Sequence, residues 1–339
     1  MEKIKGILKE LAISFSVSGH EFYGSDTIGK LASGIFDEVK RDSVGNYILI
    51  KRSGKKDAKK LLIDAHFDTV GMMVTDIKDG GFLSFITIGG LDTNVLPSTE
   101  VIIRGKEDVY GIITSIPPHL KTTSKAPKIK ELLIDTGYSK DKIKELVSVG
   151  DPIVYKNQID FIHNDQVISA GLDDKACLCA AIDAVSKMDK ATMAYDVYLI
   201  ASMQEEVGKA GPARAAFDID PDIAIIVDVN FAKMDKDDNF ECIEIGKGAS
   251  VDISAQTDRR LTRNIRRALD ENGIEYQIVC EPKYTGTNNE PVAISGLGVR
   301  TAVLSVPLKS MHTASETASL HDIKSLSDIL VCLATREEL

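Results

Sequence analysis

The stretch KLLIDAHFDTV, residues 60–70, indicates the fold class. Its apolar run Leu61-Leu62-Ile63 shows no alternation of polar and apolar residues. Strands that are buried on both faces have this pattern, because helices cover both faces of a mostly parallel sheet. We therefore predict that residues 60–70 form a strand in the middle of an α/β sheet.

Helix and strand patterns alternate on both sides of this stretch. Before it, residues 26–35 have helical spacing after a candidate N-cap at Ser25, and residues 47–50 have a strand pattern after a Gly-Asn turn. Beyond residue 168 the alternation resumes, with helices predicted at 174–188 and 261–272 and strands at 196–203, 222–229 and 300–306. These segments predict an α/β domain.

Residues 71–163 have a different pattern. Short apolar runs such as GGFLSFITIGG and EVIIRG are separated by turn residues, and only 128–147 looks partly helical. This predicts a small β-rich module, a barrel or a sandwich. We interpret it as an insertion at 71–163 in a discontinuous domain formed by 1–70 and 164–339, because candidate site residues lie on both sides of it. Three domains in a row are the alternative.

The composition narrows the class of protein. The 339 residues are 43% hydrophobic and 27% charged, as in an ordinary soluble globular protein, and the net charge of -10 argues against a nucleic-acid binder, which would present a basic face. No apolar run approaches the roughly 18 residues of a membrane helix, and no signal-peptide pattern is present, so we expect no membrane association. Five cysteines without a CxxC pair predict reduced thiols in a cytoplasmic protein.

Histidines and carboxylates follow the predicted strands. Ligand sites of open α/β sheets lie beyond the carboxyl ends of the strands, so we expect these side chains to converge on one edge of the sheet. The residues concerned are His66, Asp68, Asp173, Asp174, Glu205, Glu206, Asp228 and His312.

Each of these residues also has a purely structural interpretation. A single histidine is more often a hydrogen-bonded core residue than a ligand, Asp173-Asp174 suit a helix N-cap, and Glu205-Glu206 suit a solvated face. Asp228 is harder to explain, because it follows five apolar residues and a charge at the end of a buried strand needs a partner. The set is therefore more informative than its members.

Two histidines with several carboxylates and no thiolate suit zinc, cobalt or manganese. Charge balance favours a pair of ions, because two divalent ions offset the carboxylates of Asp173, Glu206 and Asp228 together with one shared hydroxide. Two ions roughly 3.5–4 Å apart lower the pKa of a shared water towards about 7. The remaining glutamate of the Glu-Glu pair is then free to accept a proton.

The motifs DAHFDTVG, GLDDKA, QEEVG, IVDVN and VPLKSMHTASE resemble, in this order, those of the dinuclear-metal glutamyl and deblocking aminopeptidases. The resemblance covers nearly the whole chain. It implies a zinc-peptidase-like mixed sheet flanked by helices, with an inserted β-rich domain that joins homodimers into a tetrahedral dodecamer. It also implies short peptides as substrates and two divalent ions per subunit, zinc or cobalt, with manganese as a further option.

The roles of the family transfer to this chain where the motifs match. The resemblance implies that Asp173 bridges two ions, that Glu205 is the general base and that Asp68 orients His66. The implied metal ligands are His66, Asp173, Glu206, Asp228 and His312.

Three stretches depart from the family pattern. Thr69 stands where a Glu is usual, Lys175 and Cys177 where Arg and Gly are usual, and Asn288 where an Asp is usual. These departures motivate one alternative, a degenerate member that binds peptides or assembles without turnover. A second alternative is an endoglucanase-type glycosidase that uses Glu205 and Glu206 as its two carboxylates, but it leaves the histidines without a role.

Overall fold

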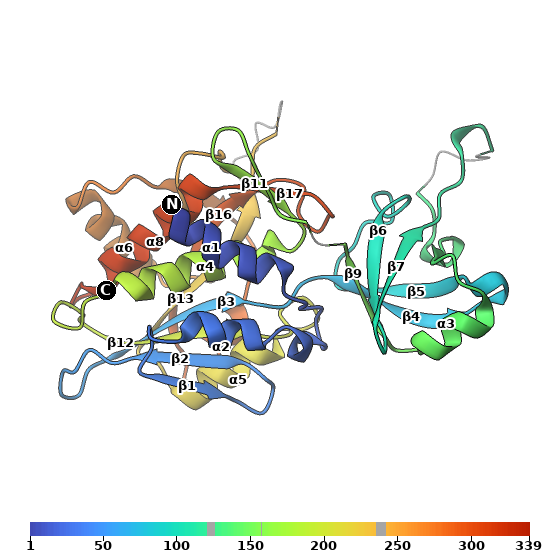
Figure 1. Cartoon of the computed structure of the whole chain (residues 1–339). Helices are drawn as coiled ribbons and strands as arrows, with labels where there is room; N and C mark the ends of the chain where they lie inside the picture. The colour runs from blue at the N-terminus through green and yellow to red at the C-terminus, as the bar shows by residue number, and fades with distance from the viewer. Residues whose placement is uncertain (121–125, 157, 235–241) are drawn as a thin grey trace.

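A computed structural model describes residues 1–120, 126–156, 158–234 and 242–339. Figure 1 shows a larger part, in which helices cover a sheet, and a separate small barrel at its side. The predicted α/β class with a mixed sheet flanked by helices and an additional β barrel is confirmed. Among the described residues, no helix combines the length and apolar content that crossing a bilayer requires.

The larger part is built on an eight-stranded mixed sheet with the order β1-β2-β12-β3-β13-β16-β14-β15. Four adjacent strands in its middle are parallel: β12 (Asp196–Ser202), β3 (Lys60–His66), β13 (Ile223–Phe231) and β16 (Arg300–Leu308). Antiparallel pairing adds β2 (Tyr47–Lys51) and β1 (Glu38–Arg41) at one side and β14 (Ser250–Ser254) at the other, with β15 (Gln277–Glu281) parallel to β14. The carboxyl ends of the parallel strands therefore share one edge.

The predicted burial of β3 on both faces is confirmed. Leu61 and Ile63 belong to the core under one layer of helices, whereas Leu62 belongs to the core under the other layer. The first layer consists of α1 (Glu2–Ile13), α2 (Asp26–Ala32), α4 (Leu172–Lys187), α6 (Arg259–Glu271) and α8 (Leu320–Ala334), and the second of α5 (Ala210–Ile219) and α7 (Asn289–Ala293). Successive side chains of a strand point to opposite faces, so both faces must be apolar.

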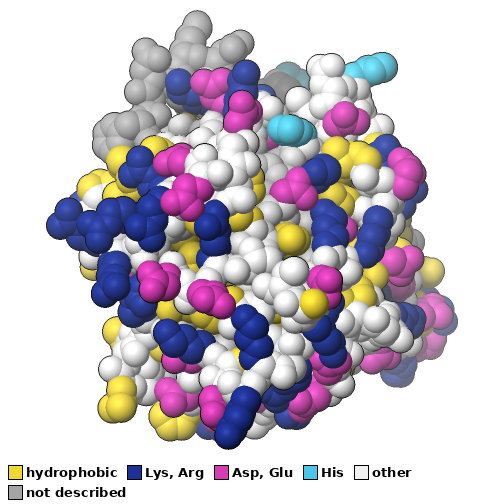
Figure 2. Space-filling model, turned by 90° about the vertical axis from the view of Figure 1, so that its left-hand side faces the viewer, with side chains coloured by type: hydrophobic (Ala, Val, Ile, Leu, Met, Phe, Trp, Pro, Cys, Tyr) yellow, Lys and Arg dark blue, Asp and Glu magenta, His cyan; other side chains and the backbone are white. Residues whose placement is uncertain are grey.

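Helix α6 shows how the outer surface is built. Leu261, Ile265 and Leu269 recur at every fourth position and are buried against the core. Its arginines lie on the remaining surface of the helix, and four of the five are exposed: Arg259, Arg260, Arg263 and Arg267. Figure 2, which views the molecule from this end, shows Lys and Arg side chains gathered at the left-hand side.

The smaller part is a closed barrel with the order β4-β5-β8-β7-β6-β9. Its strands are β4 (Gly71–Ile77), β5 (Leu83–Ile88), β6 (Glu100–Arg104), β7 (Asp108–Ile113), β8 (Ile134–Asp135) and β9 (Pro152–Tyr155). Burial alternates strictly along β7, as expected for a strand with one face towards the barrel interior. Within the helical pattern predicted at 128–147, only η4 (Ile129–Glu131) and α3 (Lys140–Leu146) are helical, because β8 lies between them.

A three-stranded sheet lies beside the main sheet and consists of β10 (Asp160–Ile162), β11 (Gln166–Ser169) and β17 (Glu316–Ser319). The pairing of β11 with β17 places Glu316 opposite Ser169. The start of α4 follows a few residues after Ser169, so this small sheet brings Glu316 to the edge where β3, β12 and β13 end. Short 3-10 turns complete the chain at η1 (Glu21–Tyr23), η2 (Asp79–Gly81) and η3 (Pro118–Leu120).

Candidate metal centre

His66 is the last residue of β3 and is only 2% exposed. Its Nδ1 lies 2.8 Å from the main-chain oxygen of Asp68. Because a carbonyl oxygen can only accept a hydrogen bond, Nδ1 carries the proton and donates it. The Nε2 atom, 3.1 Å from Oδ1 of Asp173, is then the atom that offers a lone pair to the site.

His312 lies in the loop after β16 and follows the same rule. Its Nδ1 donates to the main-chain oxygen of Gly90, 2.8 Å away, in the turn that follows β5 of the barrel. Its Nε2 lies 3.2 Å from Oδ2 of Asp173 and 3.2 Å from Oε1 of Glu206. Histidines that bind metals usually donate their second ring N–H in this way, which fixes the tautomer and the orientation of the ring.

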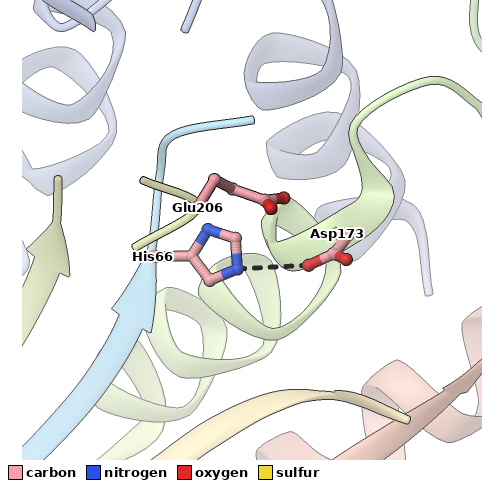
Figure 3. Close-up of side chains that lie close together, drawn as sticks. All are labelled: His66, Asp173 and Glu206. Atoms are coloured by element: carbon pink, nitrogen blue, oxygen red, sulfur yellow. Dashed lines mark hydrogen bonds and ion pairs between the residues drawn. The ribbon is translucent and has the colours of Figure 1, made fainter. Parts of the chain in front are cut away.

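Asp173 lies between the two histidines. One oxygen of its carboxylate approaches His66 and the other approaches His312. Asp173 is 6% exposed at the start of α4, where the Asp173-Asp174 peptide bond is cis. Figure 3 shows the side chains of His66, Asp173 and Glu206 pointing towards one another from three different segments.

These contacts fit a pair of metal ions. A neutral Nε2 and a carboxylate oxygen both present lone pairs, so they repel one another unless a cation lies between them. When no metal ion is bound, a proton on the histidine must take the place of that cation. Burial opposes the imidazolium, but hydrogen bonds to Asp173 and Glu206 outweigh it and raise the pKa of His312 to about 11. A divalent ion between the same atoms satisfies both sides without that proton.

Asp228 and Asp174 lie on the side of His66. Oδ1 of Asp228 lies 3.8 Å from Nε2 of His66. Among the residues that the structure describes, two groups of side chains have ligand atoms within 4.8 Å of one another, namely His66, Asp173 and Glu206, and His66, Asp174 and Asp228. Burial raises the pKa of both Asp174 and Asp228 well above its usual range, so their anionic forms need a cation nearby.

Asp68 is fully buried, and its carboxylate accepts hydrogen bonds from the main chain of Glu205 and Glu206. Its Oδ1 accepts a hydrogen bond from the main-chain N–H of Glu205 (3.0 Å), and its Oδ2 accepts one from that of Glu206 (3.1 Å) and one from the Ser18 hydroxyl (2.6 Å). The carboxylate lies 3.7 Å from Nδ1 of His66. The hydrogen bond that orients His66 is therefore made by the main chain of Asp68, while the side chain fixes the turn after β12.

Glu205 and Glu206 follow β12 and point to different partners. Glu206 approaches His312, whereas Oε1 of Glu205 lies 3.4 Å from Nζ of Lys209. Burial raises the pKa of Glu206 to about 7 and also raises that of Glu205. Adjacent carboxylates thus occupy two separate places, one in the donor set and one beside it.

A cavity of about 460 Å³ opens above these side chains. Its floor consists of His66, Asp173, Glu205, Glu206, Asp228 and His312, and its walls of residues 229–231 and 281–287 and Met311. The structure brings together all five expected ligands and the expected base in this one cavity, and Asp68 lies beneath it.

Glu316 received no role from the sequence, although the VPLKSMHTASE motif ends with it. It is 1% exposed and accepts hydrogen bonds from the main-chain N–H groups of His312 (2.7 Å) and Asp173 (3.2 Å). Burial raises its pKa to about 8. A glutamate four residues after a candidate ligand histidine is the signal in the sequence, but only the pairing of β17 with β11 shows what it contacts.

The residues that depart from the family pattern lie outside the lining of the large cavity. Thr69 and Lys175 line a second, small cavity of about 20 Å³, which Asp173, Glu206 and His312 also line. Nζ of Lys175 donates to the main-chain oxygen of Ser14 (2.8 Å). Asn288 is 1% exposed and donates to Oδ2 of Asp64 (2.7 Å). These substitutions therefore change the support around the site and leave the donor set complete.

The chain is similar to known proteins over nearly its whole length. Residues 45–329 match the model of the family described as M42 glutamyl aminopeptidase. The chain is 31% identical to the lysyl aminopeptidase of Pyrococcus furiosus, over 98% of this chain and 96% of the relative. It is similar to the solved TET aminopeptidase of Thaumarchaeota archaeon SCGC AB-539-E09 (TM-score 0.93, 27% identity, 99% and 98% coverage). It is also similar to the TET1 peptidase of Pyrococcus horikoshii, which can assemble into a tetrahedron or a large octahedral shell (TM-score 0.85, 29% identity, 98% and 99% coverage).

Proposed function

The chain belongs to the M42 glutamyl aminopeptidase family, and on that premise we propose that it removes N-terminal residues from short peptides with two divalent metal ions, zinc or cobalt, and a glutamate base. One observation carries the proposal. The two carboxylate oxygens of Asp173 each face Nε2 of a different histidine, and the main chain fixes the tautomer of both rings.

In this proposal the donor atoms divide into two sets that share Asp173. His66 and Asp228 complete one set, and His312 and Glu206 complete the other. When bound, the ions supply Lewis acidity, which polarises the scissile carbonyl and makes a water molecule acidic near neutral pH. The histidines and carboxylates hold these charges at the floor of the cavity, where a peptide can reach them.

Glu205 has the role of general base in this proposal. Its carboxylate lines the cavity but is outside the two donor sets, so it can accept a proton from the attacking water and return it to the leaving amine. Burial raises its pKa, which makes it a better base than an exposed carboxylate. Asp68 assists by holding the main chain of Glu205 through the 3.0 Å hydrogen bond to its N–H.

The Glu205→Gln variant tests this role. We expect turnover of aminoacyl amides to fall by about 10²–10⁴-fold, because that is the usual contribution of a general base. The variant should retain two metal ions per chain. The matched control is Glu145→Gln, an exposed glutamate of the barrel that pairs with Lys142. Turnover comparable to wild type in Glu205→Gln, with the metals present, would refute the assignment.

We also propose that residues 71–163 form an oligomerisation domain that joins homodimers into a dodecamer. Two observations support this. Apolar side chains on the strands of the barrel are exposed at Ile86, Tyr110 and Ile112, and the Pyrococcus horikoshii relative assembles into closed shells. A single-chain mass by light scattering would contradict this assembly. A cytoplasmic location remains a prediction from the cysteines.

A further inference from the structure

Lys209 follows β12 and immediately precedes α5, and it is not among the residues that line the cavity. Its side chain is 24% exposed, and its Nζ lies 3.4 Å from Oε1 of Glu205 and 3.5 Å from Oε2 of Glu290. Nζ also donates hydrogen bonds to the main-chain oxygens of Gly286 (2.7 Å) and Thr287. Four oxygen atoms, one from the turn after β12 and three from residues 286–290, thus surround one ammonium group.

The backbone conformation at Lys209 keeps its side chain close to Glu205. Lys209 has a positive φ of 61°, and its N–H donates to the main-chain oxygen of Gln204 (2.8 Å), which closes the turn that contains both glutamates. The side chain therefore folds back over Glu205. Its tip is anchored by the carbonyls at 286 and 287, in the segment that forms one wall of the cavity.

Glu205 needs such a partner. Its neighbours include the carboxylates of Asp68 and Asp173, which repel it, and His66 and Lys209, which attract it. Across the described ranges, Lys209 is the only lysine or arginine with an ion pair to Glu205. Partly buried pairs such as this one are screened less by salt than pairs on the open surface, so the attraction can hold a carboxylate in one orientation.

We propose that Lys209 is a positioning residue that holds the Glu205 carboxylate in place for proton transfer. This inference rests on the proposed role of Glu205 as base. Lys209 is not among the residues that line the cavity, so it acts through Glu205 and not on the substrate. Removal of the Lys209 side chain should therefore lower kcat more than it changes KM. The enzyme still binds the substrate equally well, but a loosely held Glu205 is less often oriented for proton transfer.

Lys209→Met and Lys209→Arg test the proposal, with Lys142→Met, which removes an exposed lysine paired with Glu145 on the barrel, as the matched control. In Lys209→Met we expect kcat to fall about 10–100-fold, as for other residues that orient a catalytic group, with KM changed less than about threefold and two metal ions retained. Lys209→Arg keeps the positive charge and should recover at least part of kcat. Should Lys209→Met not fold, Lys209→Gln keeps donors for the carbonyls at 286 and 287 and gives the same comparison.

A folded, metal-loaded Lys209→Met variant with the kcat of the wild type would overturn the proposal. So would a loss that appears entirely in KM, since that would assign Lys209 to the cavity wall alone. Failure of the proposed function looks different, because then the wild type itself shows no turnover, or Glu205→Gln keeps it. An active wild type, an inactive Glu205→Gln and an unimpaired Lys209→Met would together reject only this inference.

Discussion

The barrel and the central sheet bury different kinds of side chain. Among the described residues between 71 and 155, no acidic, basic or histidine side chain is buried, and the buried ones are hydrophobic, for example Val101, Ile103 and Ile134. The sheet and its helices instead bury many charged residues, including His66, Asp68, Asp173, Asp174, Lys175, Glu205, Asp228 and Glu316. Both parts have apolar cores, but within the described ranges only the part built on the sheet also buries acidic, basic or histidine side chains.

This contrast has a physical reason in the free energy of burying charge. Burying a charge costs free energy unless a partner compensates it, so a part that is purely scaffold avoids such groups. The barrel follows that rule and still touches the site, through the carbonyl of Gly90 and the hydroxyl of Tyr155 at His312. It contributes orientation, while the edge of the sheet contributes charge.

The largest effect should follow from removing the shared charge. In Asp173→Asn, the carboxylate that belongs to both proposed donor sets becomes a neutral amide. We expect kcat/KM to fall by at least about 10³-fold, since Lewis acidity contributes several kcal/mol, and elemental analysis should show fewer than two ions per chain. If the variant retains two ions and near wild-type turnover, the buried charge of Asp173 is not required for function. Asp252→Asn, a buried carboxylate away from the cavity, is the control and should retain both ions.

A smaller effect should appear in the pH dependence of stability. Asp252 is fully buried among the hydroxyls of Ser250 and Ser305, and burial raises its pKa from 3.8 to about 6. The native state therefore keeps this proton at pH values where the unfolded chain has released it. The unfolding free energy should decrease as pH rises from about 4 to about 6, by up to about 3 kcal/mol from this group.

Asp252→Asn should remove this contribution, so that the difference in stability between variant and wild type changes with pH. Urea denaturation at several pH values measures it. Parallel curves for the two proteins would show that the burial of Asp252 carries no such cost, and would weaken the distinction between the two cores.

The smallest effect should come from the barrel side of the site. The hydroxyl of Tyr155 donates a long hydrogen bond of 3.3 Å to the main-chain oxygen of His312. In Tyr155→Phe we expect a loss of less than about 1 kcal/mol, seen as a modest decrease in metal affinity, because a net hydrogen bond of this kind contributes little. A decrease in metal affinity as large as that of Asp173→Asn would mean that the barrel does more than orient His312.

Much of the fold could be predicted because periodic patterns report burial directly. The strand predicted at 196–203 is observed at Asp196–Ser202, and the helix predicted at 174–188 at Leu172–Lys187. The helix predicted at 26–35 ends earlier, at Ala32. Local pattern does not specify such an end, since Ile35 and Phe36 are also apolar and pack against the same core outside the helix.

The sequence alone determined the fold class, the family and the residue types available for a metal centre, because apolar periodicity, strand ends and ordered motifs are properties of the chain itself. Only the tertiary structure decided the contacts among those residues. Examples are the carbonyl of Gly90 that sets the tautomer of His312, the hydrogen bond from the main-chain N–H of Asp173 to Glu316, and the approach of both histidines to Asp173. Hydrogen bonds and ion pairs act over a few ångströms, and segments more than a hundred residues apart reach that distance only when the sheet has assembled.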